Sequence, residues 1–156
     1  MKSETFKQRI SIFPMMVSDK KGLDRIADLL KTNKLPYKDL SLTDSIFLSY
    51  HEENGKMVGS GGLEFYSDFA LLRSLAVDEK YRGKKIGESI VNDLLARAIA
   101  RSIREVYLLT ETAHDFFIKL GFKDVDRSGV PTVVKESSEF SSVCPVSAAC
   151  MLYQLS

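Results

Sequence analysis

The fold is decided by one stretch of the chain, Leu72-Arg73-Ser74-Leu75-Ala76-Val77-Asp78-Glu79-Lys80-Tyr81-Arg82-Gly83-Lys84-Lys85-Ile86-Gly87-Glu88-Ser89. An apolar strand ends at Val77, a short polar turn follows, and a helix opens directly at Arg82 and Gly83. The start of a helix offers unpaired N–H groups and the positive end of the helix dipole. Gly83 and Gly87 let a bulky anion approach the backbone, and Arg82, Lys84 and Lys85 add positive charge. The stretch therefore predicts a cradle for a diphosphate.

A helix start that merely carries solvated lysines is the competing interpretation of this basic segment. Two glycines that flank the first helical turn, immediately after an apolar strand, favour the phosphate cradle. The segment is not the dinucleotide fingerprint, because Gly-x-Gly-x-x-Gly is absent after the first strand. It is not a P-loop either, because the chain has no Gly-Lys-Ser/Thr triplet.

Strands and helices alternate on both sides of this segment. Strands are expected over 7–13, 45–50, 57–66, 69–77, 105–109 and 148–153, and another begins at Phe122. Helices are expected from Ser18 or Asp19 to Asn33, over 86–102, from a Thr112 cap to Gly121, and within 131–139. The central helix has an apolar stripe, and its members are Ile86, Ile90, Leu94, Leu95, Ala98 and Ile99. The pattern predicts a mixed α/β class with a partly antiparallel sheet.

Composition indicates one ordinary globular domain over 1–156. The chain has 156 residues, of which 44% are hydrophobic and 28% charged, enough to bury about 70% of its unfolded surface. Lys and Arg total 22 against 21 Asp and Glu, a net charge of +1, which argues against a dedicated nucleic-acid or membrane-surface binder. No signal-peptide or membrane-spanning run is visible, so a cytoplasmic location is expected.

The few cysteines and histidines point away from a metal site. Cys144 and Cys150 lack metal-ligand spacing and are expected to pack as small apolar residues, although Cys144 could line a substrate pocket. His51 and His114 are both expected at the surface. We therefore expect no metal.

Two motifs together carry a resemblance to a known family. Leu75-Ala76-Val77…Tyr81-Arg82-Gly83-x-x-Ile86-Gly87 resembles the acetyl-coenzyme A signature Arg/Gln-x-x-Gly-x-Gly/Ala of the GNAT N-acetyltransferase superfamily. Ala113-x-x-Phe116-Phe117-x-Lys119-x-Gly121-Phe122 resembles the second motif of that superfamily, usually Ala-x-x-Phe-Tyr-x-x-x-Gly-Phe. The resemblance covers nearly the whole chain. It implies the GNAT fold, a mostly antiparallel central sheet with a splayed parallel strand pair and flanking helices.

A narrower resemblance rests on four segments. They are Gly61-Gly62-Leu63-Glu64, Leu71-Leu72-Arg73-Ser74-Leu75-Ala76-Val77, Tyr107-Leu108-Leu109-Thr110-Glu111-Thr112-Ala113, and Ser138-Glu139-Phe140…Cys144-Pro145…Ala148. They resemble the small ArsN-type acetyltransferases encoded with arsenic-resistance genes, which are similar to short amino-acid acetyltransferases of the acetylglutamate-synthase kind. This implies acetylation of a small acidic amino acid, or of a toxic analogue such as arsinothricin or phosphinothricin.

The resemblance implies acetyl-CoA as co-substrate and no metal. The implied cofactor-binding residues are Leu75, Ala76, Val77, Arg82, Gly83, Lys84, Lys85, Ile86, Gly87, Glu88, Ser89, Thr112, Phe116, Phe117 and Lys119. Two of them depart from the family pattern. Lys85 stands where the signature has its middle glycine, and Phe117 stands where many relatives have a tyrosine that acts as general acid.

The implied mechanism is direct attack of a free amine on the acetyl thioester in a ternary complex. The backbone of Leu75 to Val77 would pair with the pantetheine arm, and the N–H of Val77 or a neighbour would polarise the carbonyl. A thiol pKa near ~8.5 makes the thiolate a tolerable leaving group without the tyrosine. Tyr107 or water could then supply a proton.

Glu64 is the candidate base, because it lies near a strand end beside the cofactor strand, after glycines that open space. The competing interpretation is an exposed strand-end glutamate. The glycines at Gly59, Gly61 and Gly62, with Ser60 between them, mark either a ligand site or a β-bulge.

Arg73 and Ser74 are the other candidate acceptor-binding residues. Arg73 lies four residues before Val77, so even spacing places both side chains on one strand face. Its neighbours are apolar, so the guanidinium needs an anion. That anion is either the acidic end of the acceptor or an internal carboxylate in a structural ion pair.

Two other functions remain open. One is a non-catalytic acyl-CoA-binding sensor, which Phe117 in place of tyrosine favours. The other is a protein N-acetyltransferase, which Arg73 disfavours because a cation suits a small anionic acceptor. The expected partners are acetyl-CoA and a small amine, with no nucleic acid and no membrane, and a homodimer is left open.

Overall fold

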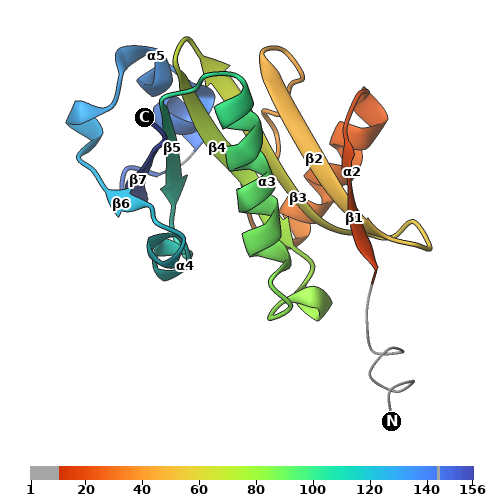
Figure 1. Cartoon of the computed structure of the whole chain (residues 1–156). Coiled ribbons are helices and arrows are strands. Elements are labelled where there is room, and N and C mark those ends of the chain that lie inside the picture. The colour runs from red at the N-terminus through yellow and green to blue at the C-terminus, as the bar shows by residue number, and fades with distance from the viewer. Residues whose placement is uncertain (1–10, 144) are drawn as a thin grey trace.

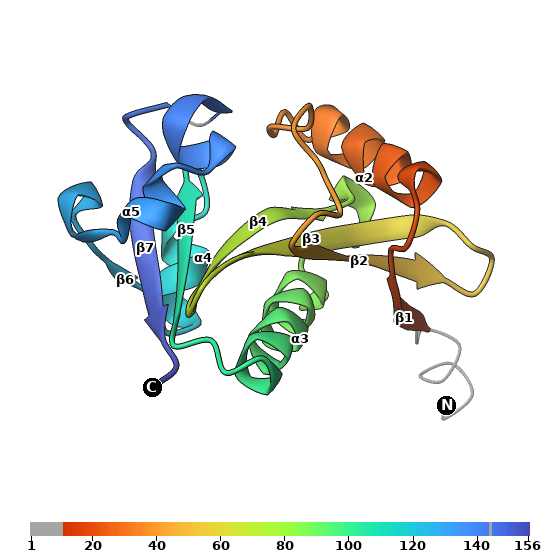
Figure 2. The ribbon, with the colours of Figure 1, turned by 90° about the horizontal axis from the view of Figure 1, so that it is seen from above.

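The computed structural model describes residues 11–143 and 145–156, which form one mixed sheet with helices on both faces (Figures 1 and 2). The strands are β1 (Ile12–Met16), β2 (Ser45–Glu52), β3 (Met57–Tyr66), β4 (Phe69–Val77), β5 (Glu105–Thr110), β6 (Lys123–Asp124) and β7 (Ala149–Gln154). The helices are α2 (Lys20–Thr32), α3 (Ile86–Ala100), α4 (His114–Lys119) and α5 (Thr132–Lys135), with short turns η1 (Glu79–Tyr81), η2 (Arg127–Gly129) and η3 (Glu139–Val143).

The strand order within the described residues is β1-β2-β3-β4-β5-β7-β6, and every neighbouring pair is antiparallel except β4 and β5. The expected mixed α/β class and mostly antiparallel sheet are thereby confirmed. None of the helices in the described ranges combines the length and apolar character that a membrane-spanning helix requires.

The parallel pair β4–β5 is joined over a short length only. Its ladder has three residue pairs, Phe69 with Glu105, Ala70 with Val106 and Leu71 with Tyr107. Beyond these pairs the two strands diverge, as Figure 2 shows. The C-terminal halves of β4 and β5 therefore border an opening in the middle of the sheet.

A β-bulge in β4 sets the direction of the side chains at this opening. Gly61 of β3 lies opposite two residues of β4, Ser74 and Leu75, because Ser60 pairs with Ala76 and Gly62 with Arg73. Ser74 takes a positive φ of 59°. The glycines predicted either a ligand site or a bulge in their own strand. The register shifts opposite Gly61, but the extra residue belongs to β4, so the bulge was expected in the wrong strand.

The bulge corrects the expectation that Arg73 and Val77 share a strand face. Val77 packs into the core beneath α3. Arg73 is opposite Gly62, where a Cβ atom would meet the Phe47 ring of the core beneath α2. Because the extra residue shifts the alternation by one, the Arg73 side chain lies on the α2 side of the sheet.

Helix α3 packs closely on the sheet because β3 carries glycines beneath it. A Cβ at Gly61 would lie 2.6 Å from Ile90 Cγ2 and 2.9 Å from Leu94 Cδ1. Most of the expected stripe is buried, but Ile99 is 61% exposed, so its place in the stripe was wrong. Ile99 is nine residues after Ile90, which places it about half a turn around the helix.

Several predicted element boundaries need correction. The first strand is Ile12–Met16, later than 7–13, and residues 7–10 lie outside the described residues. Asp19 caps α2 through Gly22 N–H, and Asn33 ends it, as predicted. Helix α3 begins at Ile86, as the range 86–102 predicted, but η1 and an extended Arg82 come before it, so no helix opens directly at Arg82.

Two local predictions around the site were also wrong. Thr112 does not cap α4, because Ala113 is the N-cap residue and its N–H donates to Thr110 Oγ1 at 3.0 Å. His51 is buried, not at the surface, and its ring lies between Ser49 Oγ and the Gly55 carbonyl. The alternation of β2 did not reveal His51 because both faces of this strand are covered.

Candidate active site

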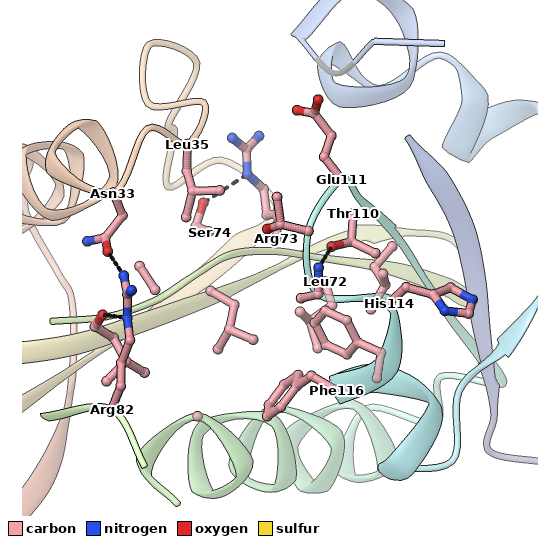
Figure 3. A pocket seen from close by; sticks show the side chains of 18 of the residues that line it. Asn33, Leu35, Leu72, Arg73, Ser74, Arg82, Thr110, Glu111, His114 and Phe116 are labelled. Carbon is pink, nitrogen blue, oxygen red and sulfur yellow. Dashed lines mark hydrogen bonds between the residues drawn. The ribbon is translucent and has the colours of Figure 1, made fainter. Parts of the chain in front are cut away.

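A cavity of about 1110 Å³ occupies the opening between β4 and β5 (Figure 3). Its floor comes from the C-terminal halves of the two strands, and the first turn of α3 and helix α4 line one side. The segment after α2, at Lys34, Leu35 and Pro36, and Glu139 of η3 complete the wall. One cavity therefore joins the predicted phosphate cradle to the region around Arg73.

The turn from Arg82 to Gly87 forms the cradle end. Gly83 has φ +80° and Lys85 has φ +62°, so the chain curls before α3 begins at Ile86. Arg82 Nε donates to the Val77 carbonyl at 3.2 Å, and Arg82 Nη2 donates to Asn33 Oδ1. Arg82 thus holds the turn to the end of β4 and to the end of α2.

This cradle fits the diphosphate of a coenzyme A. Helix α3 is 15 residues long, and its first residues Ile86, Gly87 and Glu88 line the cavity. A helix N-terminus of this kind attracts anions, and Arg82 and Lys85 border the same space. The residues present therefore suit the group that the sequence implied.

The second motif supplies the apolar wall opposite the cradle. Phe116 lies over the first turn of α3, where a Cβ at Gly87 would be only 3.3 Å from Phe116 Cζ (Figure 3). Phe117 is 4% exposed and packs edge-on against Phe122 with ring centroids 5.3 Å apart. Phe117 therefore serves mainly the core at the position where many relatives have tyrosine.

The cavity brings together most of the predicted cofactor-binding residues. Those that line it are Leu75, Ala76, Val77, Arg82, Gly83, Lys85, Ile86, Gly87, Glu88, Thr112, Phe116 and Phe117. Lys84, Ser89 and Lys119 are not among the lining residues. Their assignment stays a prediction.

The other end of the cavity holds a buried cluster of charges around Arg73. The Arg73 side chain is fully buried and forms a two-pronged pair with Asp39, each distance being 2.6 Å. Glu64 Oε2 lies 3.0 Å from Arg73 Nη1, and Glu139 Oε2 lies 3.2 Å from Arg73 Nε. The single guanidinium is thus surrounded by three carboxylates of the chain itself.

The contacts with Arg73 favour the ionised form of the Asp39 carboxyl. Burial raises the pKa of this carboxyl, but hydrogen bonds from Arg73 and Ser138 outweigh burial and hold the pKa below its ordinary value. Asp39 therefore ties the segment after α2 to β4 and to the segment that precedes η3. Whether Arg73 also binds an acceptor stays a prediction.

Glu64 does not line the cavity. It is 8% exposed, its Oε1 accepts from the Tyr66 hydroxyl at 2.8 Å, and its Oε2 contacts Arg73. The glycines before it leave no open space, because Ile90, Leu94 and Phe47 fill the room beside them. Burial, and then the bond to Glu64, raises the pKa of Tyr66.

The tyrosines near the site are held by carboxylates. The Tyr107 hydroxyl donates to Glu105 Oε1 at 2.8 Å, at the start of β5 and away from the cavity. Burial, and then this bond, raises the pKa of Tyr107. Tyr81 does line the cavity, and its hydroxyl donates to Glu52 Oε2 at 2.7 Å, which raises its pKa.

Cys150 and His114 are the remaining candidates that the structure describes, and His114 also lines the cavity. Cys150 is 6% exposed within an apolar cluster, as predicted, and burial raises the pKa of its thiol. Cys144 lies outside the described residues. His114 begins α4 with an exposed ring that contacts Asp124 at 2.9 Å, which raises its pKa. Among the described residues, no group of three or more His, Cys, Asp or Glu side chains is placed to hold a metal ion.

Sequence reasoning missed Asp39 and Glu139 as neighbours of Arg73. The need of a buried guanidinium for an anion indicated that an acidic partner existed. Nothing in the sequence indicated which of the acidic residues supplied it, because both lie far from Arg73 along the chain. Glu111, at the mouth of the cavity, was not singled out either.

Comparisons with known proteins agree with this geometry. The family model described as "Acetyltransferase (GNAT) domain" matches residues 43–124. The chain is 31% identical over 97 residues to an uncharacterised N-acetyltransferase of Chlorobaculum tepidum, covering 62% of this chain and 60% of that protein. It is 38% identical over 82 residues to the amino-acid acetyltransferase of Mycobacterium tuberculosis, covering 51% of this chain and 46% of that protein. The matches thus span about half to three fifths of these curated relatives.

Solved structures extend the likeness over nearly the whole chain. A Mycobacterium tuberculosis protein solved with CoA and NLQ has a TM-score of 0.74 and 26% identity, covering 91% of this chain and 99% of that one. N-acetylglutamate synthase of Neisseria gonorrhoeae, solved with coenzyme A and N-acetyl-glutamate, has a TM-score of 0.74 at 14% identity, over 95% of this chain and 35% of that one. This second likeness supports the fold alone. The family match over residues 43–124 shows that the chain belongs to the GNAT acetyltransferase family, and the splayed strand pair agrees with it.

Proposed function

We propose that the protein transfers the acetyl group of acetyl-CoA to the primary amine of a free amino acid, by direct attack in a ternary complex. The observation that carries this proposal is the single cavity that joins the α3 cradle to the Arg73 cluster. The two substrates would meet where β4 and β5 separate. Leu75 to Val77 would hold the pantetheine arm, and Arg82 to Gly87 the diphosphate.

An amino-acid acceptor is supported by the relatives. One is named an amino-acid acetyltransferase, and a solved neighbour that is 26% identical contains CoA together with a second small molecule. The acceptor end of this cavity suits a small molecule, because residues of β4, of the segment after α2 and of η3 enclose it.

Acidic acceptors, including the arsinothricin-like and phosphinothricin-like molecules of the ArsN-type resemblance, form the narrower version of this proposal. Such an acceptor needs a cation, and Arg73 is a buried cation at that end of the cavity. The Asp39 carboxylate accepts hydrogen bonds from both terminal nitrogens of the Arg73 guanidinium, so an acidic acceptor side chain would have to displace it. A neutral amino acid would bind without that exchange.

The test is a thiol-release assay with acetyl-CoA against a panel of amines, with mass spectrometry of the products. The panel contains glutamate, phosphinothricin and arsinothricin, their neutral counterparts, and a peptide with a free N-terminus. We expect release with at least one free amino acid. Binding of acetyl-CoA in a calorimeter without release on any amine would favour the sensor. Release with the peptide alone would favour a protein N-acetyltransferase.

A further inference from the structure

We propose that Glu139, in place of Glu64, is the carboxylate that takes the proton from the acceptor ammonium, and that Arg73 is the positioning residue that holds it there. The inference deepens the proposed function and rests on it only in requiring an amine acceptor. It assigns a catalytic role to a residue of η3 that the sequence analysis named only within a resemblance segment and gave no role.

Glu139 is the buried carboxylate of the Arg73 cluster that borders the cavity. It is 5% exposed and lines the cavity beside Arg73 and Ser74. Its Oε2 lies 3.2 Å from Arg73 Nε, and the same Nε donates to Ser74 Oγ at 3.1 Å. The β4 bulge at Ser74 thus presents the Glu139–Arg73 contact to the space where the strands separate.

The other carboxylates at this end are less suitable. Neither Glu64 nor Asp39 lines the cavity, so neither borders the space that an acceptor would occupy. Glu111 lines the cavity but is exposed at its mouth, as Figure 3 shows. A buried carboxylate interacts with an incoming ammonium more strongly than an exposed one, because water screens it less.

The net negative charge of the Arg73 cluster favours binding of a cationic ligand. Three carboxylates surround one guanidinium, so with all groups ionised the cluster carries two excess negative charges. An amine acceptor arrives as an ammonium ion. The cluster attracts that ion, and the neutral amine needed for attack forms when one proton leaves it.

The reaction then balances as follows. One ammonium proton passes to a carboxylate oxygen of Glu139 and on to solvent. The freed nitrogen lone pair forms a C–N bond with the thioester carbon, and the C–S bond of acetyl-CoA breaks. A second nitrogen proton neutralises the departing thiolate, so the products are the amide, free coenzyme A and one proton in solution.

The test compares Glu139→Gln with Glu136→Gln, a matched change of an exposed glutamate at the end of α5. We expect Glu139→Gln to lower kcat about 10²-fold at pH 7, with unchanged acetyl-CoA affinity by calorimetry. The deficit should shrink as pH rises and the free amine becomes abundant. Glu136→Gln should leave kcat and its pH profile unchanged.

Two further variants keep the proposal falsifiable. If Glu139→Gln melts early, Glu139→Asp retains the carboxylate and should keep the wild-type pH profile at reduced kcat. Wild-type kcat in Glu139→Gln at pH 7, a deficit that does not change with pH, or a pH-dependent deficit in Glu64→Gln or Glu111→Gln instead would overturn the assignment. These assays use whichever amine the wild type acetylates, so failure of the amino-acid proposal is detected separately.

Discussion

Replacing Arg73 by methionine tests whether the charge cluster holds the acceptor end of the molecule together. Methionine keeps an unbranched apolar chain but removes the guanidinium that faces Asp39, Glu64 and Glu139. The variant leaves three carboxylates close together with no cation. Removing one partner of a buried ion pair costs about 3–5 kcal/mol.

The corresponding change in melting temperature is large. For a chain of this size each kcal/mol lowers Tm by about 2–4 °C. We therefore expect Arg73→Met to melt about 6–20 °C below the wild type in differential scanning calorimetry. Arg101→Met is the matched control, because Arg101 is exposed and its guanidinium lies over the Phe65 ring.

A double-mutant cycle sharpens the test. Asp39→Asn removes one of the carboxylates that Arg73→Met leaves unpaired, so the double variant should lose less stability than the sum of the two single variants. A Tm within about 2 °C of wild type for Arg73→Met would refute the view that the cluster stabilises the fold. An unchanged Tm with a higher acceptor KM would instead show that Arg73 binds the acceptor directly.

Three more outcomes follow from the cradle and the cluster. Gly87→Leu should raise the KM for acetyl-CoA at least tenfold, about 1.4 kcal/mol, because the new leucine side chain would meet Phe116. Gly129→Leu should leave this KM unchanged, because the space beside Gly129 is open, and equal KM values for the two variants would contradict the prediction. Lys85→Gly should raise the free energy of unfolding by roughly 0.5–1 kcal/mol in urea titrations, because φ is +62° there; a lower value would contradict this. Because the pKa of Asp39 is lowered from 3.8 on folding, its stabilisation is full above that value and is lost as pH falls through the lowered pKa. The stability gap between wild type and Asp39→Asn should therefore begin to close as the pH falls below 3.8, and it should not widen.

Local signals in the sequence were sufficient for most of the fold. The Asp19 cap, the strand that ends at Val77 and the apolar spacing of Ile90 and Leu94 depend on residues close together in the chain. The two sequence motifs, through their resemblance to the GNAT family, also predicted the splayed strand pair. Such features are predictable because propensity, capping and periodicity all act within a few residues.

The acceptor end was less predictable because it depends on contacts between distant segments. The bulge at Ser74 reverses the face on which Arg73 lies, and no glycine or asparagine marks that position. Asp39 and Glu139 reach Arg73 from a loop and from a short turn whose paths the sequence pattern does not determine. Their charges were visible in the sequence, but their meeting point was not.

The short ladder between β4 and β5 divides the sheet into two halves, which are paired only from Phe69 with Glu105 to Leu71 with Tyr107. A molecule lying between the diverging strands contacts both halves, so its binding free energy also couples their unfolding. Amide hydrogen exchange should therefore slow on both sides of the opening together when the cavity is filled. If the cavity holds acetyl-CoA as proposed, the free energy of unfolding rises with the acetyl-CoA concentration.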